Sequence, residues 1–129
     1  MDAQGRPVAA FVASASVHES QLVEPTLSQR WVEKLPTRLV GDKAYDSDEL
    51  DTKLQAVGVE MIAPHRKNRV KPKTQDGRKL RRIKRRYKIE RTNSWFKNYR
   101  RLIVRWEYYS QNLLGFVLLA AAALYLKNV

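Results

Sequence analysis

Apolar residues in the first half of the chain alternate between short runs and helical spacings. Short apolar runs bounded by Gly or Pro are typical of strands, and apolar positions three and four residues apart are typical of helices. The predicted elements are a strand at 8–15, a helix at 20–35, a strand at 38–41, a helix at 46–57 and a strand at 59–63. The order strand, helix, strand predicts a parallel crossover, and therefore an α/β fold.

The ends of two predicted elements carry local signals. Asp46, followed three residues later by Glu49, fits a capping box at the start of the second helix, and Gly58 fits its end. Residues 4–7 predict a turn of the kind that joins two strands. Because too few residues precede this turn to form the upstream strand, we expect the chain to begin in the middle of a fold.

The second half of the chain is polar until its last helix. Residues 65–79 are basic and interrupted by Pro and Gly, which predicts an exposed loop, and residues 80–106 show helical spacing. A further helix is predicted at 112–127, in which residues 113–126 are continuously apolar. A membrane-spanning helix needs about 20 such residues. We therefore expect a buried core helix and no membrane as a partner.

Charge is concentrated in one part of the chain. The sequence has 25 Lys and Arg against 13 Asp and Glu, a formal charge of +12, and no Cys. Residues 66–105 contain 18 of the basic and 2 of the acidic residues, so this segment carries +16 and the remainder −4. The absence of Cys excludes disulfides, thiolate catalysis and Cys-ligated zinc. A hydrophobic content of 43% predicts a folded core. Together these features favour a domain that docks a polyanion through one basic segment.

The predicted helix 80–106 carries one acid on a basic face. Viewed down the helix axis, an apolar stripe lies opposite Glu90. Its members are Thr92, Trp95, Phe96, Tyr99, Leu102, Ile103 and Trp106. The face of Glu90 itself carries Arg86, Ser94, Lys97 and Arg101. Two interpretations are open. Glu90 could simply pair with Arg86 and Ser94 one turn away, or it could be a metal-binding carboxylate inside a phosphate-binding groove.

Asp42 is a second candidate acid, because it directly follows the predicted strand 38–41. In open α/β sheets, ligands bind beyond the carboxyl ends of the strands, although Asp is also an ordinary turn residue there. Asp46 has the simpler explanation of a helix cap. His18 and His65 lack the spacing of metal ligands, and no role is assigned to them.

Both candidate acids lie in recognisable stretches. Asp42 is in residues 41–47, Gly-Asp-Lys-Ala-Tyr-Asp-Ser, and Glu90 follows Arg86 by four residues and precedes Lys97 by seven. The first stretch resembles the segment that carries the second catalytic aspartate of insertion-sequence DDE transposases. The second matches the spacing of that family's Tyr-Arg-Glu-Lys signature, except that Ile83 stands where the Tyr would fall. The resemblance covers essentially the whole chain, as the C-terminal part of the catalytic domain.

This resemblance implies a ribonuclease-H-like fold in which Asp42 is the second catalytic acid and Glu90 the third. Together they would hold Mg²⁺ or Mn²⁺. The reaction would be metal-assisted attack by water, and then by a DNA 3′-hydroxyl, on a phosphodiester at the ends of the element. Arg86 and Lys97 would contact DNA phosphates, with Arg101 and Lys43 as further DNA-binding candidates.

The family's first aspartate has no counterpart in this sequence. It lies on a strand upstream of the hairpin, whereas Asp2 falls in the hairpin turn. We therefore expect a domain truncated at its N-terminus, with a hairpin and strand-helix-strand core at 1–64, a basic loop at 65–79, and the Glu-bearing and apolar helices at 80–129. We expect the metal ion to bind only when the missing aspartate is present, and this chain alone to be inactive.

The expected partner is double-stranded DNA with the terminal inverted repeats of the element, together with a second copy of the chain or a full-length transposase. A cytoplasmic, nucleoid-associated location is expected, since no secretory signal is visible. The alternative function is a non-enzymatic basic module that binds nucleic acid through residues 66–105. Trp95, Phe96 and Tyr99 could then stack on bases, although such a helical stripe is more typical of a core. Association with ribosomal RNA is a third hypothesis that no feature favours.

Overall fold

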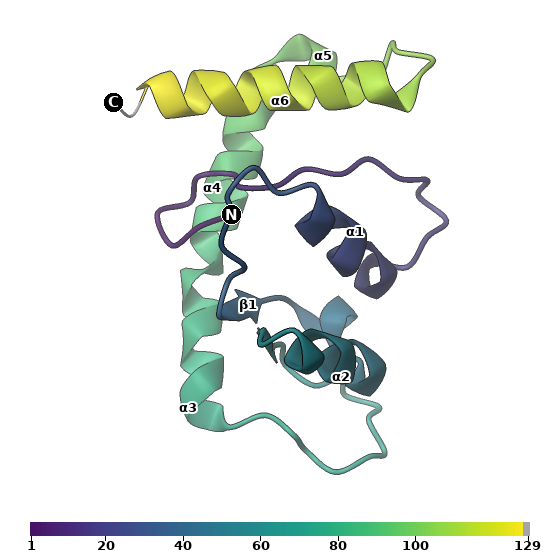
Figure 1. The fold of residues 1–129 in the computed structure, drawn as a ribbon, viewed down its shortest axis with the longest axis vertical. Helices are drawn as coiled ribbons and strands as arrows, with labels where there is room; N and C mark the ends of the chain where they lie inside the picture. Colours follow the sequence, from purple (N-terminus) through teal and green to yellow (C-terminus); the bar gives the residue numbers. More distant parts are fainter. Residues whose placement is uncertain (128–129) are drawn as a thin grey trace.

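The computed structural model describes residues 1–127, with a helical column that carries a small sheet on one side and a long helix across one end (Figure 1). In chain order the elements are η1 (Glu19–Leu22), α1 (Val23–Ser28), β1 (Arg38–Val40), η2 (Lys43–Tyr45), α2 (Asp48–Ala56), β2 (Glu60–Ile62), α3 (Gly77–Leu80), η3 (Arg81–Arg86), α4 (Tyr87–Phe96), α5 (Arg100–Ile103) and α6 (Ser110–Lys127). The column is the continuous run of α3, η3 and α4. Elements named η are 3₁₀-helices.

The unit β1–α2–β2 confirms the predicted parallel crossover. β1 and β2 pair in parallel, with Leu39 opposite Met61. Leu50 and Leu54 project from α2 into the same buried cluster as Met61 and Val59. Burial of such apolar side chains is the main favourable contribution to folding. The predicted α/β class is therefore found, with two strands in the sheet that residues 1–127 form.

The predicted strand at 8–15 is wrong. Ala9 makes a single antiparallel bridge with Arg30, and the residues after it are irregular. A strand needs a neighbour that satisfies its backbone N–H and C=O groups. Along 10–15, the described part of the chain provides no such neighbour, so the apolar pattern is not realised as a strand.

The predicted helix at 20–35 is shorter than its apolar spacing suggests. It consists of η1 and α1 and ends at Ser28. The apolar residues beyond this end are Trp31, Val32 and Leu35, with 40%, 38% and 37% of their surface exposed. Helical spacing stabilises a helix mainly when its apolar face packs against another element, and here that packing is weak.

The predicted helix at 80–106 is also interrupted. The column begins at Gly77 and ends at Phe96, and α5 is separated from it by a turn in which Tyr99 is extended, with φ −96° and ψ 110°. Thr92 of the apolar stripe is buried as expected, but Trp106 is 74% exposed. Because of this interruption, the last residues of the apolar stripe no longer lie on the same helix face as Thr92.

The last predicted helix exists as α6, but the expectation that it forms a buried core is wrong. Only 17% of it is buried, and Leu119 and Leu126 are 67% and 78% exposed. Within residues 1–127, α6 is the one helix that length and composition would allow to cross a membrane. It meets the rest of the chain along a narrow side that includes Ala120 and Ala121. The predicted segment 80–129 extends two residues beyond the described part of the chain.

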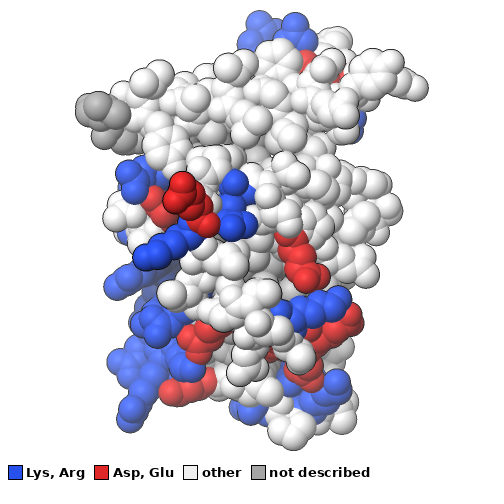
Figure 2. Space-filling view, in the orientation of Figure 1, with Lys and Arg blue, Asp and Glu red and all other residues white. Residues whose placement is uncertain are grey.

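Charged side chains are unevenly distributed over the surface. In Figure 2, Lys and Arg gather at the lower left, over the part of the column that Figure 1 draws there, whereas the α6 end is largely free of charge. Acidic side chains are interspersed with basic ones nearer the sheet and α2. The basic segment predicted from sequence therefore covers the column and the loop that precedes it.

Candidate active site

Asp42 lies at the carboxyl end of β1, as predicted. Its Oδ1 accepts a hydrogen bond from the N–H of Ala44 at 2.8 Å, so that Asp42 caps η2. Gly41 leaves room for the side chains of Met61 and Tyr45, because a Cβ there would lie 2.5 Å from Met61 Cε and 2.7 Å from Tyr45 Cδ2. The side chain of Asp42 remains 39% exposed, which leaves its second oxygen available to a partner.

Arg86 is that partner. Its Nη2 lies 3.6 Å from Asp42 Oδ2, and η3 lies against β1 at this level. Glu90 follows one helical turn later in α4, and its side chain is exposed and has no hydrogen bond or ion pair with any residue in 1–127. The interpretation that Glu90 pairs with Arg86 and Ser94 is therefore wrong, because Arg86 is engaged by Asp42. The two stretches singled out in the sequence meet through this contact.

The other predicted DNA-binding residues have different surroundings. Lys97 caps the C-terminal end of α4, where a cation is favoured by the helix dipole, and its side chain is exposed. Lys43 is exposed in η2, next to Asp42 in the chain. Arg101 of α5 is paired with Glu107 at 3.2 Å. Lys43 and Arg86 are thus associated with Asp42, whereas the charge of Arg101 is partly neutralised elsewhere.

The carboxylates near Asp42 are the type of ligand that a magnesium ion prefers, but there are too few of them to form a site. Magnesium prefers oxygen ligands, and carboxylates supply them. Within the described residues, however, no three Asp, Glu, His or Cys side chains converge. Of the two oxygens of Asp42, one accepts a backbone hydrogen bond and the other faces a guanidinium. Residues 1–127 do not by themselves form a magnesium site.

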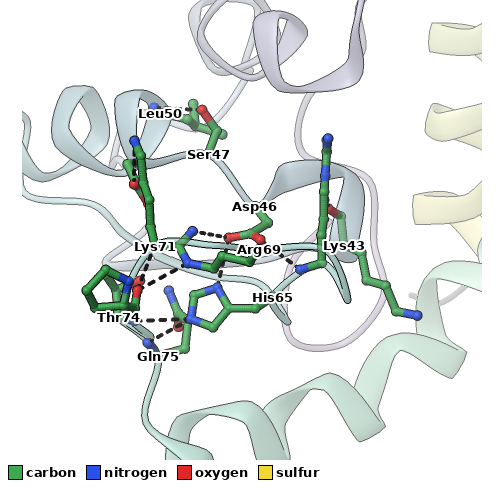
Figure 3. A network of polar contacts seen from close by, with 12 residues as sticks. Lys43, Asp46, Ser47, Leu50, His65, Arg69, Lys71, Thr74 and Gln75 are labelled. Atoms are coloured by element: carbon green, nitrogen blue, oxygen red, sulfur yellow. Dashed lines mark hydrogen bonds and ion pairs between the residues drawn. The ribbon is translucent and has the colours of Figure 1, made fainter.

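A second polar cluster surrounds Asp46 (Figure 3). Its Oδ1 accepts hydrogen bonds from His65 Nδ1–H and Arg69 Nη1–H, both at 2.9 Å, and its Oδ2 accepts one from the N–H of Arg66 at 2.8 Å. The prediction that Asp46 caps α2 is therefore wrong, and the cap is the neighbouring Ser47. Asp46 instead fastens the loop that follows β2 to the start of α2.

His65 received no role from the sequence, yet it connects both ends of this loop. Burial alone would raise the pKa of Asp46, but the hydrogen bonds from Arg66 and His65 outweigh burial and hold that pKa below its ordinary value. His65 Nε2 accepts hydrogen bonds from the N–H groups of Thr74 and Gln75 at 3.1 and 3.3 Å. Because a backbone N–H can only donate, Nε2 is unprotonated and Nδ1 carries the proton shared with Asp46.

One signal in the sequence could have identified this cluster. Asp46 and His65 both lie a few residues beyond strands that were predicted to be parallel. The carboxyl ends of parallel strands meet at the same edge of a sheet. Their proximity, although not their roles, was therefore implied by the predicted crossover.

The N-terminal turn holds α4 in place. Lys88, Arg91 and Thr92 donate hydrogen bonds to the consecutive carbonyls of residues 3–5, the last from Thr92 Oγ1 at 2.6 Å. Tyr125 of α6 donates to the carbonyl of the same turn's Pro at 2.7 Å. The turn therefore ties α4 to α6 on a side of α4 other than the one that carries the exposed acid.

Comparison with known proteins identifies one related family. A family model described as "Transposase DDE domain" matches residues 1–125. No curated protein and no solved structure matches the chain. The matched range includes the crossover, the column and both stretches that contain the candidate acids.

Proposed function

Because the chain belongs to the family of transposase DDE domains, we propose that it carries two acids of a transposase site, Asp42 and Glu90, beside a DNA-binding surface. Membership implies a ribonuclease-H-like fold, DNA as the partner, and chemistry on phosphodiesters. Transposases of this family generally use a divalent metal ion and act in the cytoplasm.

The contact between Arg86 and Asp42 carries the proposal. A turn aspartate needs only its local backbone hydrogen bond, such as the one from Ala44. Here a guanidinium from a distant helix approaches the same carboxylate at 3.6 Å. The helix that supplies it also bears Glu90 one turn later. This arrangement supports a shared site more strongly than two unrelated acids would.

In the proposed reaction, water and then a DNA 3′-hydroxyl attack phosphodiesters at the ends of an inserted element with inverted repeats. Each attack forms one P–O bond and breaks the P–O bond to a 3′-oxygen, which leaves as the 3′-hydroxyl of the cut strand. Asp42 and Glu90 are two of the ligands that a complete site would need for Mg²⁺ or Mn²⁺. Arg86, Lys97 and Lys43 would bind phosphates near the cut, with Arg101 further away. Because residues 1–127 assemble no third acid, we propose that this chain alone does not cleave DNA.

Two measurements test the proposal. In a strand-transfer and hairpin-cleavage assay with Mg²⁺ or Mn²⁺, the chain should show no turnover; robust cleavage that Glu90→Gln abolishes would overturn the proposed inactivity. In a Mn²⁺ titration followed by electron paramagnetic resonance, the two carboxylates should give no more than residual binding, because a complete set of ligands is absent from residues 1–127. Glu90→Gln and Asp42→Asn should each weaken it further. Glu49→Gln is the matched control, because Glu49 is exposed and paired with Lys53.

A non-enzymatic nucleic-acid-binding module is the second candidate. One observation favours it: Glu90 stands exposed on a basic surface with no polar partner among the described residues. For such a module, Glu90→Gln should leave Mn²⁺ binding unchanged. It should also strengthen duplex binding slightly, because a negative charge is removed from a surface that faces phosphates. The same titration therefore separates the two functions.

A further inference from the structure

We propose that four exposed cations of η3, namely Arg81, Arg82, Lys84 and Arg85, form an anchoring site for the phosphate backbone of duplex DNA. This inference rests on the proposed function, which already requires DNA as the partner. It specifies which part of the +16 segment holds the DNA, and it places this anchoring site outside the site of Asp42.

The 18 basic residues of 66–105 differ in the partners of their side chains. Arg69, Lys71, Lys79, Arg86 and Arg101 form ion pairs with acids. Arg66, Lys88, Arg91 and Arg105 donate to backbone carbonyls. In the remaining nine of the 18, the charged group of the side chain has no hydrogen bond or ion pair within residues 1–127. These nine are Lys67, Lys73, Arg78, Arg81, Arg82, Lys84, Arg85, Lys97 and Arg100. Five of these nine fall within residues 78–85, which concentrates the uncompensated charge on the column.

The helical geometry of η3 places its exposed cations in rows. Its six residues form a 3₁₀-helix, whereas runs of this kind rarely exceed three or four. With three residues per turn and a rise of about 2 Å per residue, positions i and i+3 align about 6 Å apart. Ile83 and Arg86 form one such row, in which Ile83 is half-buried and Arg86 reaches Asp42. The two remaining rows are 81 with 84 and 82 with 85, and all four of these residues are exposed.

The cations of these two rows repel one another. No acid occurs between Gly77 and Ile89, and the spacing within each row is shorter than the screening length of about 8 Å at physiological salt. Like charges at this separation repel and destabilise a helix. Duplex DNA presents a negative charge for about every 1.7 Å of its axis, and cations that neutralise its phosphates release counterions. Bound phosphates would therefore relieve the repulsion that the isolated chain maintains.

The position of η3 favours DNA over an anionic membrane. Binding at a lipid surface relies on apolar side chains next to the cations. The exposed apolar helix α6 lies across the opposite end of the column from α3, whereas η3 lies beside β1 (Figure 1). In Figure 2 the basic patch at the lower left is correspondingly separated from the upper end, where few side chains are charged.

The test compares two variants with the same net charge. The first replaces Arg81, Arg82, Lys84 and Arg85 with Gln, and the second replaces Lys34, Lys53, Lys67 and Lys73 with Gln; all eight residues are exposed. Duplex binding is measured by fluorescence anisotropy between about 50 and 200 mM salt. For the η3 variant, the slope of log Kd against log salt should fall by roughly 3 to 4, and affinity should drop at least about 100-fold. The control variant should lose about 1 or less from the slope.

Several outcomes would overturn the inference. Equal losses in both variants would mean that net charge, rather than η3, governs binding, and an unchanged η3 variant would mean that the anchor lies elsewhere. A loss seen with an RNA hairpin or with anionic vesicles, but not with duplex DNA, would assign the cluster to another partner. A wild-type chain with no salt-dependent duplex binding would instead contradict the proposed function.

A folding control keeps the test informative. The η3 variant should melt at a higher temperature than wild type, because repulsion between neighbouring cations is removed. The triple variant Arg81→Lys, Arg82→Lys and Arg85→Lys should retain the full salt slope, since phosphate contacts of this kind need charge rather than a guanidinium. If the Gln variant did not fold, single Gln substitutions at the four positions should each reduce the slope by about 1, and no reduction would overturn the inference.

Discussion

The sheet end of the molecule and the column contain the same kinds of basic residues but differ in what surrounds them. At the sheet end, Asp46, Asp48 and Glu60 each accept hydrogen bonds or ion pairs from at least two donors. In the column, no acid occurs between Gly77 and Ile89. The +16 segment therefore has two parts: one fastens the loop to the sheet, and the other includes exposed cations of the column that have no acidic partner within residues 1–127.

The two regions also differ in what stabilises them. The sheet end has the main apolar cluster, and three of its acids, Asp46, Asp48 and Glu60, have lowered pKa values. For Glu60, the hydrogen bonds from Lys79 and Arg38 lower the pKa and outweigh the effect of burial. The column has few buried side chains, and α4 is held by hydrogen bonds from its polar residues to the N-terminal turn. Substitutions in the two regions should therefore have effects of different size and different pH dependence.

The largest effect is expected from Leu54→Ala in α2. Leu54 is 1% exposed and lies in the apolar cluster beneath the sheet. Removing it should lower the free energy of unfolding by about 2–5 kcal/mol, because apolar contacts are lost and a cavity remains. Urea denaturation followed by circular dichroism measures this change. Leu119→Ala in α6 is the control, since that side chain is 67% exposed and its loss should cost less than about 0.5 kcal/mol.

An intermediate effect is expected from Asp46→Asn. The Asp46 side chain is 6% exposed, and the change weakens its hydrogen bonds with His65 and Arg69, which should cost about 2 kcal/mol at neutral pH. The folded-state pKa of Asp46 lies below its ordinary value of 3.8. Its stabilisation is therefore present above about pH 4 and is lost as the pH falls through the folded-state pKa.

The pH dependence gives this prediction its control. Thermal unfolding between about pH 2 and pH 7 should show a smaller loss of stability on acidification for Asp46→Asn than for wild type. Glu49→Gln, at an exposed position in the helix α2 that follows Asp46, should leave the wild-type profile nearly intact. Parallel acid profiles for wild type and Asp46→Asn would contradict the assignment of Asp46 as the acid that fastens the loop.

The smallest effect is expected in the column, from Thr92→Val. Valine keeps the shape of the side chain but removes the hydrogen bond to the carbonyl of Gly5, which leaves that oxygen without this donor. The expected loss is about 1 kcal/mol. Hydrogen exchange should be faster in the N-terminal turn and unchanged in β1 and β2. Thr92→Ser, which keeps the hydroxyl, should restore the protection, and equal protection in the Val variant would contradict a clamping role for Thr92.

The parts of the fold that were predicted correctly depend on neighbours in sequence. β1, α2 and β2 were identified from short apolar runs and helical spacing, and they bury the same side chains that defined those patterns. The strand predicted at 8–15 was wrong because a strand requires a partner elsewhere in the chain. The helix predicted at 80–106 is found up to Phe96 and again in α5, and it is interrupted between them, because the pattern does not reveal where packing ends.

The candidate site was likewise predicted correctly in some parts and not in others. The position of Asp42 at the end of a strand was predicted and confirmed. Its contact with Arg86 was not predicted, because the pattern around Arg86 suggested a partner one turn away, namely Glu90. The roles of His65 and Thr92 were missed for a related reason. Thr92 binds a carbonyl of the remote N-terminal turn, and His65 binds backbone groups of a loop with no regular pattern.

The sequence by itself determined the family, the crossover and the amount of basic charge between residues 66 and 105. Those properties depend on residue identity and on spacings of a few positions. Only the tertiary structure decided which cations are paired and which remain available. Pairing depends on separations of about 4 Å between side chains, and screening makes the same charges nearly independent beyond about 10 Å. Arg69 and Arg82 are equivalent in composition, but the first lies between two aspartates and the second lies on an exposed row of η3.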